Sequence, residues 1–192
     1  MNGFTPLLGN TLLPKKYIAS HRLGINIGSK KQWGIGLFES VIHSRNNGEG
    51  GFDIDYLNPI IFYRSVESNL GSADNALVGL DLNYNSKYGE LYGQLIIDEF
   101  KFSELGKNWW ANKYGYQLGY RHVKPLNNSY GHIAQVELNQ VRPYTYSHYN
   151  PLNSFSHYNQ ALAHPYGANL REITAKYVAY RPKIPLVNIR II

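Results

Sequence analysis

The sequence has no cysteine, few charged residues and no long apolar run. Each of these features excludes or disfavours a class of protein or a kind of site. Without cysteine, disulfides and thiolate metal sites are excluded. No stretch of about 18 apolar residues occurs, so a transmembrane helix is not expected. Charged residues make up 17% of the chain, which is low against the roughly 25% of typical soluble domains.

The basic residues are spread along the chain rather than clustered. The formal net charge is +6, yet the longest basic runs are the pairs Lys15-Lys16 and Lys30-Lys31. Nucleic-acid binding proteins normally carry a basic stripe or patch, so no nucleic-acid partner is predicted. The net charge favours anionic partners such as acidic sugars or the phosphates of lipopolysaccharide.

Aromatic residues are abundant, and most of them are tyrosines. They reach 14% of the chain, with 17 Tyr, 7 Phe and 3 Trp. Tyrosine joins an apolar ring to a polar tip and therefore suits the interface between a membrane and water. The alternative is a tyrosine-rich soluble β-sandwich, where the same ring fits a half-buried strand.

Apolar and polar residues alternate with period two through most of the chain, which predicts β-strands. In 91–98, for example, Leu91, Leu95 and Ile97 alternate with polar positions such as Gln94 and Asp98. The same alternation occurs in 22–27, 33–38, 75–84, 114–121, 133–139 and 172–179. We expect one outward apolar face that includes Leu80, Leu82, Leu95, Ile97, Leu118, Tyr120, Val136 and Leu138. We expect the opposite face to include Asp81, Asp98, Gln94, Arg121, Glu137 and Lys176.

The lengths of these segments and of their connections favour an all-β, antiparallel transmembrane β-barrel over a sandwich. Segments of about 8–11 residues are long enough to cross a bilayer at the tilt of barrel strands. Short turns are expected at 29–31 and 85–89, and long connections at 44–51, 66–74, 100–113 and 145–169. Short and long connections alternate in this way in outer-membrane barrels.

We count eight to ten strands in a single segment spanning 1–192, depending on whether 52–64 and the last residues are strands. So few strands make only a narrow barrel. We therefore predict an incomplete barrel with unpaired edge strands near Tyr17–Gly28 and Val187–Ile192.

Eight stretches, in order, resemble the capsule-assembly Wzi family, and specifically the Bacteroidetes branch of gliding-motility proteins of the RemB type. They are Lys15–Leu23, Gly36–Val41, Tyr56–Arg64, Ala73–Asp81, Leu91–Phe100, Trp109–Gly115, Asn139–Tyr146 and Tyr158–Asn169. The resemblance implies a location in the outer membrane and a role in attaching or assembling surface polysaccharide, with a further link to gliding motility. It also implies contact with outer-membrane lipid and lipopolysaccharide.

Members of this family are longer barrels with a signal peptide and a helical N-terminal region. Residues 1–13 lack the basic and apolar regions of a signal peptide. We therefore expect the chain to be an internal or C-terminal part of such a barrel.

The segment Arg142–Asn169 is the best candidate for ligand binding, because it concentrates aromatic and planar polar groups. Aromatic faces stack on sugar rings, amides bind hydroxyls, and an arginine fork matches a carboxylate. We expect six of its residues to gather at the lumen or its mouth and contact an acidic polysaccharide: Arg142, Tyr144, Tyr146, His157, Tyr158 and His164. The alternative is a structured loop that uses these groups to satisfy its own backbone.

Trp109 and Trp110 have two interpretations, an anchor in an aromatic belt or an exposed stacking platform for glycan. The histidines at 148, 157 and 164 match no compact metal motif, so no metal is expected. Asp98 and Glu99 do not form a glycosidase pair, because adjacent residues on a strand point to opposite faces.

No cofactor and no catalytic residue is predicted. Two other functions stay open, an outer-membrane pore or transport barrel, and a soluble β-protein with a carbohydrate-binding face.

Overall fold

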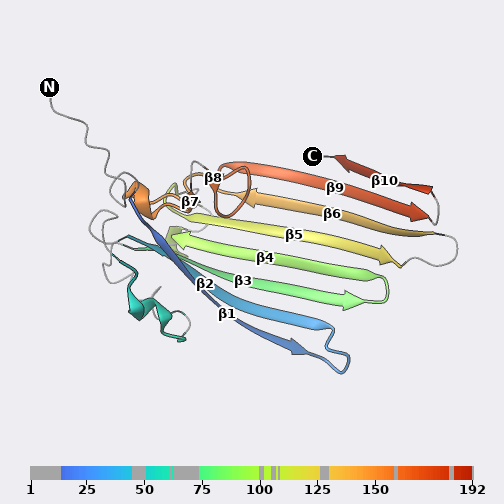
Figure 1. The fold of residues 1–192 in the computed structure, drawn as a ribbon, viewed down its shortest axis with the longest axis horizontal. Coiled ribbons are helices and arrows are strands. Elements are labelled where there is room, and N and C mark those ends of the chain that lie inside the picture. Colours follow the sequence, from blue (N-terminus) through green and yellow to red (C-terminus); the bar gives the residue numbers. More distant parts are fainter. Residues whose placement is uncertain are drawn as a thin grey trace.

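The chain forms one open antiparallel sheet with a long loop across one end (Figure 1). The computed structural model describes residues 14–44, 51–60, 62, 74–99, 102–104, 107, 109–125, 130–157, 160–181 and 184–191. The eight strands of the sheet, in spatial order, are β1 (Tyr17–Ile27), β2 (Trp33–His43), β3 (Asn75–Ser86), β4 (Gly89–Glu99), β5 (Lys113–Lys124), β6 (Gly131–Val141), β9 (Leu170–Arg181) and β10 (Ile184–Ile191). Two short strands, β7 (Ser156–His157) and β8 (Gln160–Ala161), pair with each other inside the long loop.

The pairing register places the expected apolar residues on one face of the sheet. One row across the strands runs Ile35, Leu82, Gly93, Leu118, Leu138 and Ile173. The neighbouring rows on this face contain Leu37, Leu80 and Leu95, and Tyr84, Leu91, Tyr120 and Val136. Because side chains alternate along a strand, Asp81, Gln94, Arg121 and Glu137 lie on the other face, as predicted. We call these the apolar face and the polar face.

The sheet is not closed. Within the described residues β1 pairs only with β2, and β10 pairs only with β9. The two edge strands are those that the sequence predicted, and the outer strands β1 and β10 leave backbone groups without a neighbouring strand.

The connections separate the sheet into two ends. The shorter connections, which join β1 to β2, β3 to β4, β5 to β6 and β9 to β10, lie at what we call the turn end. Longer connections at 44–74, 100–112 and 142–169 leave from the opposite end, the loop end, so short and long connections alternate as expected. Residues 45–50 and 63–73, which make up most of the long connections expected at 44–51 and 66–74, lie outside the described residues. Figure 1 shows the last of these connections, which includes β7 and β8, gathered over the loop end of the sheet.

The first long connection contains a 3₁₀ turn rather than a strand in its described part. This turn spans Ile54–Leu57, and the ring of Tyr56 stacks on His43 with centroids 3.6 Å apart. It therefore covers the apolar face where β2 ends. None of the described helices is long and apolar enough to cross a membrane.

Candidate functional site

The long loop, residues 142–169, crosses the polar face from β6 to the far side of the sheet and returns to β9. At its far point the carbonyl of Ser154 accepts a hydrogen bond from Lys16 Nζ at 2.9 Å. The carbonyl of Asn153 accepts one from Asn75 Nδ2 at 2.9 Å, and Ser44 Oγ donates to Asn153 Oδ1 at 2.8 Å. Polar groups at the starts of β1 and β3 and the end of β2 therefore hold the loop in place.

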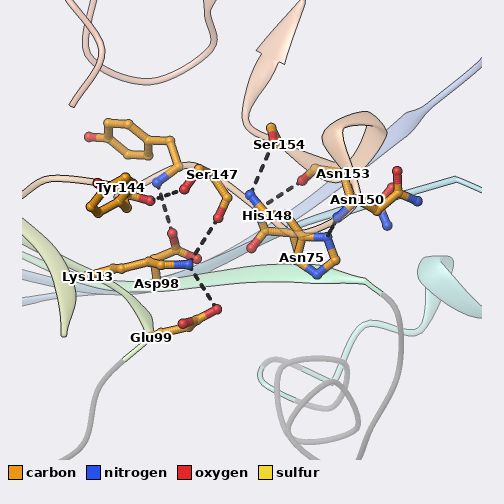
Figure 2. Close-up of polar contacts among 11 residues, drawn as sticks. Asn75, Asp98, Glu99, Lys113, Tyr144, Ser147, His148, Asn150, Asn153 and Ser154 are labelled. Carbon is orange, nitrogen blue, oxygen red and sulfur yellow. Dashed lines mark hydrogen bonds and ion pairs between the residues drawn. The ribbon is translucent and has the colours of Figure 1, made fainter. Parts of the chain in front are cut away.

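Two further anchors lie where β4 ends and β5 begins, and Figure 2 shows them. The Tyr146 N–H donates to Asp98 Oδ2 at 2.9 Å. Lys113 Nζ donates to the Ser147 carbonyl at 3.2 Å and pairs with Glu99 at 3.0 Å. Because this lysine is buried, the two contacts also compensate its charge.

A small hydrophobic core lies between the loop and the polar face. Ile42, Leu77, Ile96 and Val141 of the sheet pack with Tyr146 and Phe155 of the loop. Tyr146 has a positive φ of 78°, a conformation that costs a non-glycine residue about 1–2 kcal/mol. Burial raises the pKa of Tyr146 to about 12, although a hydrogen bond from the His164 backbone N–H to its hydroxyl oxygen acts in the opposite direction, so the hydroxyl stays protonated. The packed ring and these bonds hold the unfavourable conformation.

A cavity of about 590 Å³ lies between this loop and the polar face. This volume is in the range of roughly 300–1,000 Å³ that holds small organic ligands. Its walls are apolar where Phe38, Phe155 and Leu162 line it. Its sheet side is polar, with Gln94 and Gln117 among the lining residues.

A hydrogen-bond network connects the cavity to the rest of the polar face. Tyr92 Oη donates to Glu137 at 2.7 Å, and Asn139 Nδ2 donates to Glu137 at 2.8 Å. The same Asn139 amide bonds Glu172 at 3.2 Å, and His164 Nε2 lies 3.2 Å from that carboxylate. The two carboxylates are thus surrounded by donors, as buried charge requires.

At the other side of the cavity Arg22 forms a bidentate pair with Asp81, with distances of 3.0 and 2.6 Å. The pair reaches over Gly36, which lies between them on β2. A Cβ at Gly36 would lie 2.4 Å from both Arg22 Nη2 and Asp81 Oδ2. A side chain at this position would therefore displace the Arg22 and Asp81 head groups from their present positions.

The structure distributes the predicted site residues over three places. The first is an aromatic cluster at the loop end, formed by Trp109, Trp110, Tyr144 and Arg142. Trp110 and Tyr144 are 67% and 61% exposed, and their rings meet edge to face at 6.4 Å. Arg142 Nη2 donates to the Trp109 carbonyl at 3.2 Å, and its guanidinium lies 5.5 Å from the ring centre of Tyr114.

Tyr146 and His164 form the second place, at the cavity, and His157 lies apart on the exposed β7–β8 hairpin. Tyr158 falls outside the described residues. A single cluster of these residues was expected, and this expectation is corrected. Tyr144 and Tyr146 lie in different surroundings, because docking of the loop buries the ring of Tyr146 and leaves the ring of Tyr144 exposed.

Sequence reasoning did not select four lining residues as site residues: Arg22, Gln94, Gln117 and Asn139. The alternation along each strand already placed these four residues on the polar face, and this could be seen in the sequence. The register that brings them together was not visible in the sequence.

Among the described residues no three His, Asp or Glu side chains lie together in a way that would hold a metal ion. Comparisons with protein-family models, with curated proteins and with solved structures find no match to this chain.

Proposed function

We propose that this chain is a membrane-spanning part of an outer-membrane β-barrel of the Wzi type, which holds or assembles surface polysaccharide. The observation that carries the proposal is the placement of apolar surface. The hydrophobic core lies under the loop on the polar face, whereas the apolar face of the sheet is exposed except at the loop end of β2, where Tyr56 covers it.

The exposed apolar face argues against a soluble sandwich. Leu23, Ile25 and Ile173 are 60–63% exposed, and Leu118 and Val136 are 52% and 54% exposed. A soluble sheet buries this face against a second layer, and contiguous exposed apolar patches mark an interaction or membrane surface. In a lipid environment the same side chains need no cover.

Strand length agrees with a bilayer crossing. The seven longest strands have 11 or 12 residues each. At about 3.3 Å per residue and a tilt of roughly 40°, each spans about 28–30 Å, which is the thickness of the hydrocarbon core.

Aromatic side chains flank the apolar face at both ends of the strands. At the turn end the rings of Trp33 and Tyr84 lie 4.4 Å apart, and Tyr120 Oη donates to the Tyr88 carbonyl at 2.6 Å. At the loop end stands the cluster of Trp110, Tyr144 and Arg142. Two aromatic belts are typical of membrane barrels, so this arrangement favours the belt interpretation of Trp109 and Trp110.

The position of the loop favours a ligand-binding function over that of an open pore. A loop docked through a buried core across the polar face favours a binding site there rather than an open pore. The cavity beneath it combines apolar walls with amides and hydroxyl-bearing side chains, the groups that bind sugars. The resemblance to the Wzi family points to a surface polysaccharide as the ligand.

Spin labels on neighbouring residues test the membrane assignment. The full-length protein in lipid vesicles would carry a label at Leu118→Cys, on the apolar face, or at Gln117→Cys, on the polar face. We expect oxygen, which concentrates in lipid, to relax the Leu118 label, and a water-soluble nickel chelate to relax the Gln117 label. Strong relaxation of the Leu118 label by the nickel chelate would contradict the proposal.

Replacement of the loop tests the polysaccharide assignment. A full-length protein in which a short Gly-Ser linker replaces 143–168 should still assemble but release surface polysaccharide into the medium. The matched control replaces the turn residues Lys87 and Tyr88 by Asn-Gly and should retain the polysaccharide. Equal retention by both variants at equal protein level would rule out a binding role for the loop.

A further inference from the structure

A row of three amides crosses the floor of the cavity. The register places Gln94 beside Gln117 and Gln117 beside Asn139, on the adjacent strands β4, β5 and β6. All three lie on the polar face and line the cavity. Because neighbouring strands lie about 4.8 Å apart, the row spans roughly 10 Å, a length comparable with a disaccharide. We call these three residues the amide row.

Carboxylates stand at both ends of this row. Asp81 is the register partner of Gln94, and Glu172 is the partner of Asn139. Arg22 holds Asp81 through two hydrogen bonds of 3.0 and 2.6 Å. The carboxylates at both ends of the row are thus already paired with other groups of the protein.

The partner of Glu172 is His164. His164 Nδ1 accepts a hydrogen bond from the Tyr166 N–H at 3.3 Å, so the proton sits on Nε2. His164 Nε2 lies 3.2 Å from Glu172 Oε2 and donates to it. In this arrangement His164 positions a carboxylate and does not offer a positive charge to a ligand.

The cavity therefore offers no uncompensated positive charge among the described residues that line it. The basic side chains on its polar-face wall and loop wall are Arg22 and His164, and each contacts a carboxylate. The third basic residue that lines it, His21, alternates with Arg22 on β1 and contacts Glu39. An acidic sugar would have to displace Asp81 from Arg22, which would leave that carboxylate beside the carboxylate of the sugar. Like charges at such a distance repel, so the cavity disfavours an anionic ligand.

The amide row suits hydroxyl groups instead. An amide both donates and accepts hydrogen bonds, as a sugar hydroxyl does. The Gln94 side chain is exposed in the cavity, and its amide has no hydrogen-bond partner within the described part of the chain. Asn139 uses its Nδ2 group on Glu137 and Glu172, which leaves its carbonyl as an acceptor.

Apolar surfaces complete the site. Phe38 of the sheet and Tyr146, Phe155 and Leu162 of the loop line the cavity beside the amides. Such surfaces pack against the C–H faces of sugar rings. The site thus combines planar polar groups on one side with apolar contact on the other.

We propose that this cavity binds an uncharged, hydroxyl-rich stretch of polysaccharide that lies along the amide row, across the strands. This inference rests on the proposed polysaccharide function and specifies its ligand class. It replaces the acidic polysaccharide that the sequence suggested, because Arg142 lies in the aromatic cluster and donates to the Trp109 carbonyl.

The test uses the purified full-length protein and the surface polysaccharide isolated from the cells that make it. Affinity is measured for the native polysaccharide and for a carboxyl-reduced form, each at 50 and 500 mM salt (roughly 14 and 4 Å of screening length). We expect less than about threefold change with carboxyl reduction or with salt, because hydroxyl–amide bonds carry no net charge.

Two variants locate the binding. Gln94→Leu should weaken binding about three- to tenfold, the effect of one or two lost hydrogen bonds. Asn26→Leu removes an exposed amide of β1 that does not line the cavity and should bind as the unmodified protein does.

The possible failures are distinct. A tenfold or greater loss of affinity on carboxyl reduction or at high salt, with Gln94→Leu unaffected, would overturn the uncharged ligand and leave the polysaccharide function standing. Absence of binding by both forms of the polysaccharide would refute the proposed function itself, and this inference with it.

Discussion

Phe155→Ala should release the long loop from the sheet without unfolding the sheet. Phe155 is 4% exposed and packs in the small core between the loop and β2, β3, β4 and β6. Truncation of a buried phenylalanine to alanine costs about 3–5 kcal/mol. Each 1.4 kcal/mol is about a tenfold change in an equilibrium constant, so the undocked population should rise roughly a hundredfold to several thousandfold.

Hydrogen exchange measures this population. The Phe155 N–H donates to the Tyr146 carbonyl at 2.8 Å, and the Leu162 N–H donates to the Phe155 carbonyl at 3.0 Å. When closing is fast, the exchange rate of these amides follows the fraction of open loop. We expect peptides from 142–169 to exchange at least a hundred times faster in the variant than in the unmodified protein.

Tyr149→Ala is the matched control, because Tyr149 is an aromatic residue of the same loop that is 80% exposed. It should leave exchange nearly unchanged. Peptides from β6, residues 131–141, report on the sheet and should stay protected in both variants. Unchanged exchange in the loop of Phe155→Ala, or an equal rise in the β6 peptides, would refute the view that this core docks the loop on a separate sheet.

Gly36→Ala should separate the Arg22 and Asp81 head groups and destabilise the folded protein by at most about 1 kcal/mol in urea unfolding, because the added Cβ would lie 2.4 Å from atoms of both and an exposed ion pair contributes little. Burial lowers the pKa of His148 below its ordinary value, so the folded loop binds a proton less readily than the open loop. Docking should therefore weaken as the pH falls through about 6.5 towards the folded pKa, and His148→Gln should remove this contribution to the loop's protection from exchange. Leu118→Lys should reduce barrel assembly in the outer membrane, since a lysine facing the middle of the bilayer costs about 2–4 kcal/mol.

Each of these changes has a control in the same chain. Gly51→Ala adds a Cβ with no atom within 4 Å and should be neutral in urea unfolding. Gln117→Lys places the charge of Leu118→Lys on the polar face and should still assemble. Equal loss of assembly by Leu118→Lys and Gln117→Lys would contradict the assignment of the faces, and a pH response that persists in His148→Gln would assign it to another group.

The two faces of the sheet could be assigned from the sequence, because the side-chain period of a strand is a property of its backbone. Leu118 and Gln117 are neighbours in a clear alternation, and no distant part of the chain can place them on the same face. The short turns were equally local, as at Lys87 and Tyr88. The open edges at β1 and β10 followed from the number of strands and their length.

The binding site could not be predicted in this way, because it depends on pairing between distant segments. Gln94, Gln117 and Asn139 become a row only through the register of β4, β5 and β6, and a shift by one residue would turn one of them to the other face. Arg22 and Asp81 are far apart in sequence, and the register of β1, β2 and β3 brings them together across Gly36.

The loop was likewise only partly predictable from the sequence. Its richness in aromatic and polar residues is visible in the sequence, but their roles depend on where the loop docks. Docking buries Tyr146 in a core with β2, β3, β4 and β6, and leaves Tyr144, two residues earlier, exposed against Trp110. Local pattern thus determined the strands and their faces, whereas tertiary contacts determined which polar groups share a cavity, because burial and register are set by residues far away in the chain.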